Sequence, residues 1–148
     1  MGVRNGEILL VQDGVADFRL IARVFDDFGV RQQVRVVHSA NEASRWLDFY
    51  RQQAQASKLR LVVIGAAYDS PLGRPTLERI KQDENLKHVP VVLFLAENER
   101  ALIAEAYSSY ANCVIAKPND LEGFLRKIED TLRVWLLLAE LPGQSDED

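Results

Sequence analysis

The stretch RLVVIGAAYDSPLGRPTLERIK, residues 60–81, joins a short apolar run to a glycine and then to a segment of helical period. Four apolar residues lead into Gly65 without a polar break, a pattern typical of a strand buried on both faces. Pro75 suits the first turn of a helix, and Leu77 and Ile80 are spaced to share one face of it. We therefore predict a buried strand that ends at Gly65 and a helix that follows it.

The same alternation of apolar runs and helical segments extends along the chain. Apolar runs rich in Val, Ile and Leu occupy residues 7–12, 34–37, 59–65, 89–95 and 113–116. Segments of helical period follow them, beginning near residues 18, 39, 75, 102 and 119. Five strands that alternate with five helices indicate right-handed βαβ units and a parallel sheet with helices on both faces. The predicted fold class is therefore α/β, doubly wound.

Capping signals mark the ends of these helices. Gly29 is placed to stop the first helix, and Ser39 with Glu42 forms a capping box that opens the second. Asn119 and Glu122 repeat this spacing at the start of the fifth helix.

Composition bounds the class of protein. The 148 residues suit one compact domain, which we expect over 1–142, followed by a disordered acidic tail over 143–148. A net charge of −4 argues against a nucleic-acid partner. The longest apolar run, VWLLLA, is far shorter than the roughly 20 residues that a membrane span needs. Cys113 is the only cysteine, which excludes an intramolecular disulfide and favours a protein of the reducing cytoplasm.

A surface for another chain is predicted near the C-terminus. Residues 135–138, WLLL, cannot all face one core at helical spacing, so we expect Trp135, Leu136 and Leu138 to contact another chain or a segment that folds back. Tyr107 and Tyr110, on the fourth helix, are interpreted as core or interface residues. These residues together predict a homodimer through the C-terminal helix region.

In open α/β sheets ligands bind beyond the carboxyl ends of the strands. The stretches of sequence around those ends resemble a known family of proteins. ILLVQDGVADFRLI (8–21), LERIKQDENLKHVPVVLFLAE (77–97), ANCVIAKP (111–118) and VWLLLAELP (134–142) resemble a response-regulator receiver domain of the CheY-like type. The last stretch is similar to the ending of small stand-alone receivers that work with phytochrome-type sensor histidine kinases. The resemblance implies the strand order 2-1-3-4-5 and a sensor histidine kinase or other signalling protein as partner.

The resemblance also implies a role for each strand end. A receiver has an acidic pair after the first strand that binds Mg²⁺, an aspartate at the end of the third that takes phosphate from a kinase histidine, and a serine or threonine after the fourth. A lysine before a proline pairs with the phosphate, and an aromatic residue three places before that lysine moves inward when the state changes. In this sequence these positions hold, in the same order, Gln12 and Asp13, Gly65, Leu95, Lys117 with Pro118, and Val114.

These departures predict a degenerate receiver, or pseudo-receiver. Gly65 has no side chain, whereas an acyl phosphate needs a carboxylate. Asp13 is the one carboxylate left of the acidic pair and is only a weak metal candidate, so we expect no metal and no cofactor. Lys117 is left with Asp13 as its expected partner, in an ion pair that costs about 3–5 kcal/mol to break if it is buried.

The favoured function is a non-enzymatic, phosphorylation-independent protein-interaction module of two-component signalling. Two alternatives stay open. A phosphorelay receiver with a relocated acceptor would use Asp69, four residues after Gly65, although an aspartate in YDSPLG is also typical of a turn. A small flavodoxin-like ligand-binding protein would place backbone amides around a phosphate after the first strand, where Asp13 and Asp17 would repel an anion.

Overall fold

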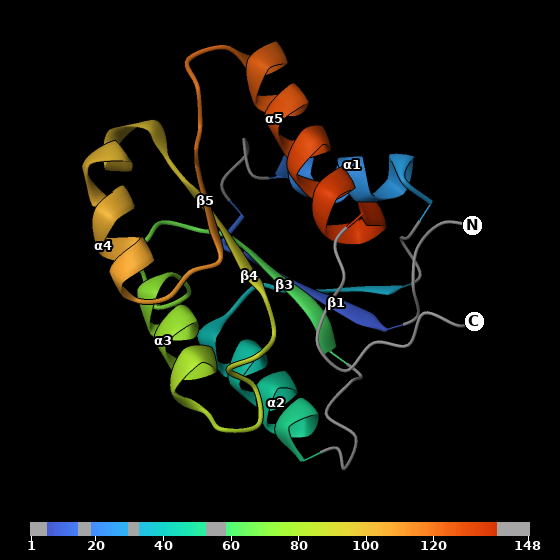
Figure 1. Cartoon of the computed structure of the whole chain (residues 1–148), viewed down its shortest axis with the longest axis vertical. Helices are drawn as coiled ribbons and strands as arrows, with labels where there is room; N and C mark the ends of the chain where they lie inside the picture. Colours follow the sequence, from blue (N-terminus) through green and yellow to red (C-terminus); the bar gives the residue numbers. More distant parts are fainter. Residues whose placement is uncertain (1–5, 15–18, 30–32, 53–58, 139–148) are drawn as a thin grey trace.

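The computed structural model describes residues 6–14, 19–29, 33–52 and 59–138. Its parallel sheet has the strand order β2-β1-β3-β4-β5 (Figure 1), which confirms the predicted topology. The strands are β1 (Glu7–Gln12), β2 (Val34–Val37), β3 (Leu59–Gly65), β4 (Val91–Leu95) and β5 (Cys113–Ala116). Only β4 starts later than predicted, directly after Pro90, which has no N–H to give to the strand ladder. Asp17 and the predicted tail over 143–148 lie outside the described residues.

Helices cover both faces of the sheet, as predicted for a doubly wound fold. On one face lie α1 (Arg19–Asp27) and α5 (Leu121–Arg133), and on the other lie α2 (Ala40–Arg51), α3 (Arg74–Gln82) and α4 (Ile103–Ser108) (Figure 1). A 3₁₀ segment, Glu97–Leu102, precedes α4. None of the helices in the described residues is long and apolar enough to span a membrane.

Two apolar cores explain why the strands lack polar alternation. Leu9 and Val11 of β1 belong to the core beneath α2, α3 and α4, whereas Ile8 and Leu10 belong to the core beneath α1 and α5. Every residue of β3 is buried. A strand covered on both faces has no side on which polar residues gain free energy, so its sequence is a continuous apolar run.

Side-chain caps start the second and fifth helices close to the predicted residues. The Ser39 hydroxyl accepts a hydrogen bond from Glu42 N at 3.1 Å, but the Glu42 carboxylate accepts from His38 N at 2.8 Å, one residue before the position expected in a capping box. The cap of α5 is Asp120, not Asn119, because the Asp120 carboxylate accepts from Gly123 N at 2.9 Å.

The last helix continues beyond Arg133 as a π-helical turn, Val134–Leu138. Leu136 in this turn is fully buried against the core beneath α1 and α5, and its carbonyl accepts a hydrogen bond from the buried Arg60 guanidinium at 2.6 Å. This placement corrects the prediction for Leu136, which packs inside its own chain and is not available to a partner. Trp135 is half-buried, and the side chain of Leu138 lies outside the described part of the chain.

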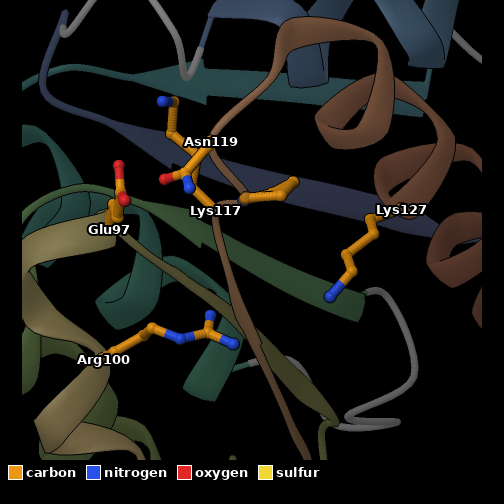
Figure 2. A pocket seen from close by; sticks show the side chains of 6 residues that line it. Glu97, Arg100, Lys117, Asn119 and Lys127 are labelled. Atoms are coloured by element: carbon orange, nitrogen blue, oxygen red, sulfur yellow. The ribbon is translucent and has the colours of Figure 1, made fainter.

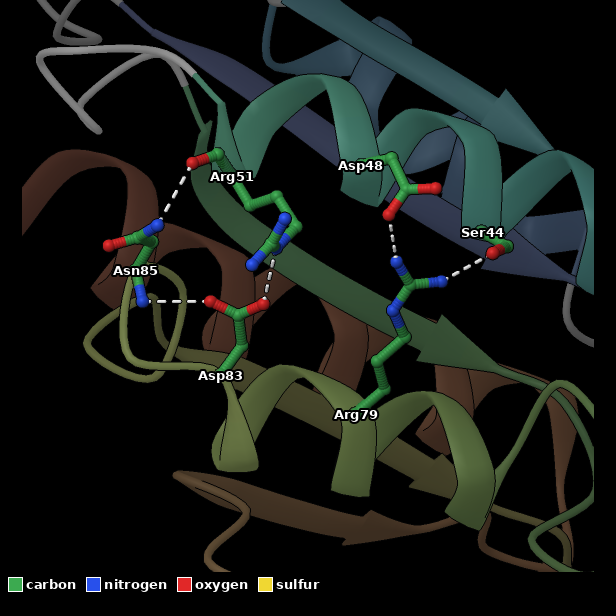
Figure 3. A network of polar contacts seen from close by, with 6 residues as sticks. All are labelled: Ser44, Asp48, Arg51, Arg79, Asp83 and Asn85. Atoms are coloured by element: carbon green, nitrogen blue, oxygen red, sulfur yellow. Dashed lines mark hydrogen bonds and ion pairs between the residues drawn. The ribbon is translucent and has the colours of Figure 1, made fainter.

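A polar network joins α2 to α3 and to the loop that follows it (Figure 3). Arg51 Nε pairs with Asp83 Oδ2 at 2.7 Å, and Arg79 donates to both Ser44 and Asp48. One partner of each ion pair is exposed, Arg51 at 42% and Asp48 at 54%, so each pair is expected to contribute no more than about 1 kcal/mol. The two helices are therefore held mainly by the core below them.

We predict that Gly73→Ala strongly destabilises the protein, because the turn between β3 and α3 has no room for a Cβ. A Cβ at Gly73 would lie 2.5 Å from Tyr68 O and closer still to Ala67 O, and backbone atoms cannot move aside as a side chain can. We expect a loss of about 3 kcal/mol or more in the free energy of unfolding, measured by urea denaturation.

Gly29→Ala is the matched control for this prediction. Gly29 has a φ of 73° with nothing near its Cβ position, so its replacement brings backbone strain without a clash and is expected to cost about 1–2 kcal/mol. A cost at Gly73 no larger than the cost at Gly29 would contradict the prediction.

Candidate functional site

The strand order reverses at β1, which has β2 on one side and β3 on the other, and the crevice of a doubly wound sheet lies at such a point. At the carboxyl end of these strands Gln12 of β1 stands opposite Gly65 of β3. Asp13 follows directly, and its Oδ2 accepts a hydrogen bond from Ala67 N at 3.2 Å. The structure therefore brings together Gln12, Asp13 and Gly65, as the sequence predicted.

Gln12 is buried at this point with only 5% of its surface exposed. Its Oε1 has no hydrogen-bond partner among the described residues. An uncompensated amide oxygen costs about 1–3 kcal/mol, whereas an ionised carboxylate at the same depth would require a cation or a charged partner. Glutamine therefore lets this end of β1 stay buried without a metal.

The described residues at this edge do not fit a resident Mg²⁺ ion. Mg²⁺ prefers octahedral oxygen ligands that usually include one or two carboxylates and substrate phosphates. Here the Asp13 carboxylate already accepts from a backbone N–H, and Gln12 and Gly65 supply no second carboxylate. In the described part of the chain, no group of three His, Cys, Asp or Glu side chains lies close enough to hold a metal.

Leu95 and Val114 are both buried in the core beneath α2, α3 and α4. The resemblance assigns their positions to a hydroxyl and to a mobile aromatic residue. An aromatic side chain reaches the same core from another element. Tyr68, in the loop after β3, is fully buried there, and its hydroxyl has no hydrogen-bond partner in the described structure. Sequence reasoning gave Tyr68 no role, although it is the one aromatic residue in residues 60–81.

Glu99 is a second residue that sequence reasoning missed. Its two carboxylate oxygens accept hydrogen bonds from Tyr68 N at 2.9 Å and from Ala96 N at 3.2 Å. One side chain thus joins the loop after β3 to the loop after β4. The charges of ENER, residues 97–100, are typical of a solvated helix face, but Glu99 instead holds two backbone N–H groups.

Lys117 and Pro118 follow β5, and Lys117 N donates to Leu95 O at 2.8 Å. Lys117 Nζ lies 6.0 Å from the centroid of the Phe124 ring, beside a hollow that faces α5 (Figure 2). The Asp13 carboxylate accepts from Ala67 N at 3.2 Å, and its ion pair with Lys117 stays a prediction.

The other predicted residues lie on the surface. Asp69 is exposed in the turn that Ser70 N closes onto Ala67 O. Tyr107 and Tyr110 are 47% and 74% exposed, so they are surface residues of this chain. The Tyr107 hydroxyl accepts a hydrogen bond from Val114 N at 3.0 Å, on the outer edge of β5. Tyr110 has a φ of 73°, a conformation that favours glycine.

Comparisons with known proteins place this architecture in a family. No family model matches the chain. The crystal structure of the phosphorylated cyanobacterial phytochrome response regulator RcpA superposes with a TM-score of 0.75 and 30% identity, over 93% of this chain and 99% of that one. This chain is a response-regulator receiver domain. It is also 24% identical to response regulator Rcp1 of Synechocystis sp. over 136 residues, 92% of each chain. The probable methanogenesis regulatory protein FilR2 of Methanothrix harundinacea is 28% identical over 136 residues, which cover 92% of the receiver and 87% of FilR2.

We predict that Tyr107→Phe destabilises the receiver, since it removes the acceptor of the Val114 N–H at the sheet edge. The expected loss is about 1–2 kcal/mol in the free energy of unfolding, together with faster hydrogen exchange of the Val114 amide. Tyr110→Phe removes a hydroxyl that is largely exposed, and it should change stability by less than about 0.5 kcal/mol. Equal effects of the two variants would show that the Tyr107 hydroxyl has no such role.

Proposed function

We propose that this receiver works without phosphorylation, as a non-enzymatic protein-interaction module of cytoplasmic two-component signalling. The observation that carries the proposal is Gly65 at the end of β3, opposite Gln12, where phosphate uptake would need a carboxylate. RcpA, which is similar to this chain along nearly its whole length, has been crystallised in a phosphorylated form. The present chain combines that fold with a site that offers no acceptor at this position.

The surrounding residues support the same proposal. Leu95 and Val114 are buried apolar side chains, and Tyr68 shares their core. Close-packed protein interiors do not deform continuously, and a switch needs two discrete arrangements of its parts. With neither a hydroxyl at Leu95 nor an aromatic ring at Val114, the chain lacks two groups that the resemblance associates with the change of state. The receiver then presents one surface at all times.

The proposal predicts that the intact mass of the wild-type receiver does not change on incubation with acetyl phosphate and Mg²⁺. The double variant Gln12→Glu/Gly65→Asp restores the acidic pair and the acceptor, so we expect it to gain the mass of one phosphoryl group in a Mg²⁺-dependent manner. Electrospray mass spectrometry measures both outcomes, and circular dichroism checks that the double variant is folded.

Asp69→Ala separates this proposal from a relocated acceptor. A phosphoryl increment on the wild type that disappears in Asp69→Ala would identify a working phosphorelay receiver that uses Asp69. An increment that persists in Asp69→Ala would also contradict the proposal, because another residue would then carry the phosphoryl group.

The partner that we propose is a second copy of this chain, bound at the β5 edge of the sheet, with a sensor histidine kinase or another signalling protein as a further partner. Tyr107 and Tyr110 extend from the end of α4 beside this edge, and Trp135 lies next to Cys113 at the start of β5. Tyr110 combines 74% exposure with a left-handed backbone, which costs about 1–2 kcal/mol for a residue other than glycine. An aromatic residue kept at that cost, where it contributes little to its own core, supports a role in binding.

We predict that Tyr110→Gly weakens self-association without weakening the fold. Sedimentation velocity over a micromolar concentration range is expected to show a dimer for the wild type and a monomer for the variant. In dilute solution, where both are monomers, urea denaturation should give the variant an equal or higher free energy of unfolding, because glycine relieves the strain at this position. Phe49→Ser, which removes an exposed aromatic side chain on α2, is the control and should leave the dimer intact. A wild type that is monomeric throughout would contradict the proposed dimer.

A further inference from the structure

A hollow of about 290 Å³ opens at the carboxyl end of β4 and β5, on the side of α5 (Figure 2). The 3₁₀ segment after β4, the loop after β5 and α5 each contribute to it. Its lining residues are Glu97, Arg100, Lys117, Pro118, Asn119 and Lys127. None of them comes from β1 or β3, and Lys117 is the one lining residue that also belongs to the predicted receiver site.

The lining carries more positive than negative charge. Arg100, Lys117 and Lys127 are cationic, and Glu97 is the one carboxylate among the lining residues. With its amide in the orientation that satisfies both groups, Asn119 donates to Glu97 Oε1 at 2.8 Å. Arg100 and Lys127 form no ion pair with any described residue. In Figure 2 their side chains extend toward the hollow from opposite sides. The lining is thus rich in charged donors around an open space.

We propose that this hollow binds a small phosphate-bearing anion, in particular a phosphomonoester. The planar guanidinium of Arg100 presents paired N–H donors that match two oxygens of a phosphate, and the Lys127 ammonium adds up to three donors. Arg100 and Lys127, which form no ion pair with the described residues, together match the charge of a dianion. The volume lies just below the range of small-molecule sites, about 300–1,000 Å³, and exceeds what a few waters fill.

This site acts independently of phosphoryl transfer. The ligand is held by charge and hydrogen bonds, no covalent bond forms, and no Mg²⁺ ion is involved. Because Arg100 and Lys127 have no part in the crevice at Gly65, variants of these two residues test the hollow alone. Binding there would couple a soluble metabolite to the loops after β4 and β5, beside the proposed dimer edge.

Titration of the ¹⁵N-labelled full chain with inorganic phosphate, and separately with AMP, tests the proposal. Both titrations contain a metal chelator and are kept at constant ionic strength. We expect saturable amide shifts centred on residues 97–100, 117–119 and 127. Arg100→Gln and Lys127→Gln should each raise the Kd about tenfold, which corresponds to roughly 1.4 kcal/mol. Arg126→Gln removes an exposed charge from the adjacent position of α5 outside the hollow and is expected to leave the Kd unchanged.

The two probes distinguish the sources of the phosphate group. Tighter binding of AMP than of phosphate would identify a phosphomonoester, and equal binding would identify free phosphate as the ligand. The proposal is overturned if neither probe gives saturable shifts, if Arg126→Gln weakens binding as much as Lys127→Gln, or if the shifts centre on Gln12 and Gly65. Thermal unfolding of each variant confirms that a lost shift reflects lost binding and not a lost fold.

Discussion

The burial of β3 on both faces is the constraint on which the rest of the structure depends. All seven residues of β3 are buried, and the strand bonds to β1 on one side and β4 on the other. Both cores therefore meet at this strand, and helices must cover it above and below. Its register with β1 sets Gly65 opposite Gln12, while Arg60 at its other end donates to the Leu136 carbonyl and so holds the last helical turn. The site and the C-terminal helix thus take their places from opposite ends of one strand.

Sequence patterns predicted the elements well wherever burial decides them. A strand covered on both faces must be apolar throughout, and a helix on its surface must be apolar along one stripe, so both periods are visible in the sequence. The observed boundaries differ from the predicted ones where a single residue determines the end of an element, as with the cap at Asp120 and the start of β4 after Pro90. The region before α4 was harder to predict, because Glu97–Leu102 is a 3₁₀ segment without buried residues and so has no apolar period.

The topology predicted which residues meet at the candidate site, but not the hydrogen bonds that they form. Parallel strands bring their carboxyl ends together, which is why Gln12, Asp13 and Gly65 meet as expected. The hydrogen bonds from Tyr68 N to Glu99 and from Ala67 N to Asp13 join residues 31 and 54 positions apart through loop backbone, and no residue pattern encodes such pairs. Likewise, an apolar run identified Leu136 as unusual, but only the π-helical turn and the Arg60 contact show that it faces its own core.

The neutral residues at the carboxyl end of β1 and β3 affect the electrostatics of the hollow beside β5. Gln12 and Gly65 are neutral where an acidic pair and an acceptor would concentrate carboxylates, and Leu95 carries no polar group. Lys117 is retained beside this neutralised edge, and its side chain also lines the hollow with Arg100 and Lys127. Like charges within one solvent-accessible hollow repel one another, and the repulsion is relieved when an anion enters. The neutral residues on which the proposed loss of phosphoryl transfer rests therefore also favour the proposed anion binding, one strand away.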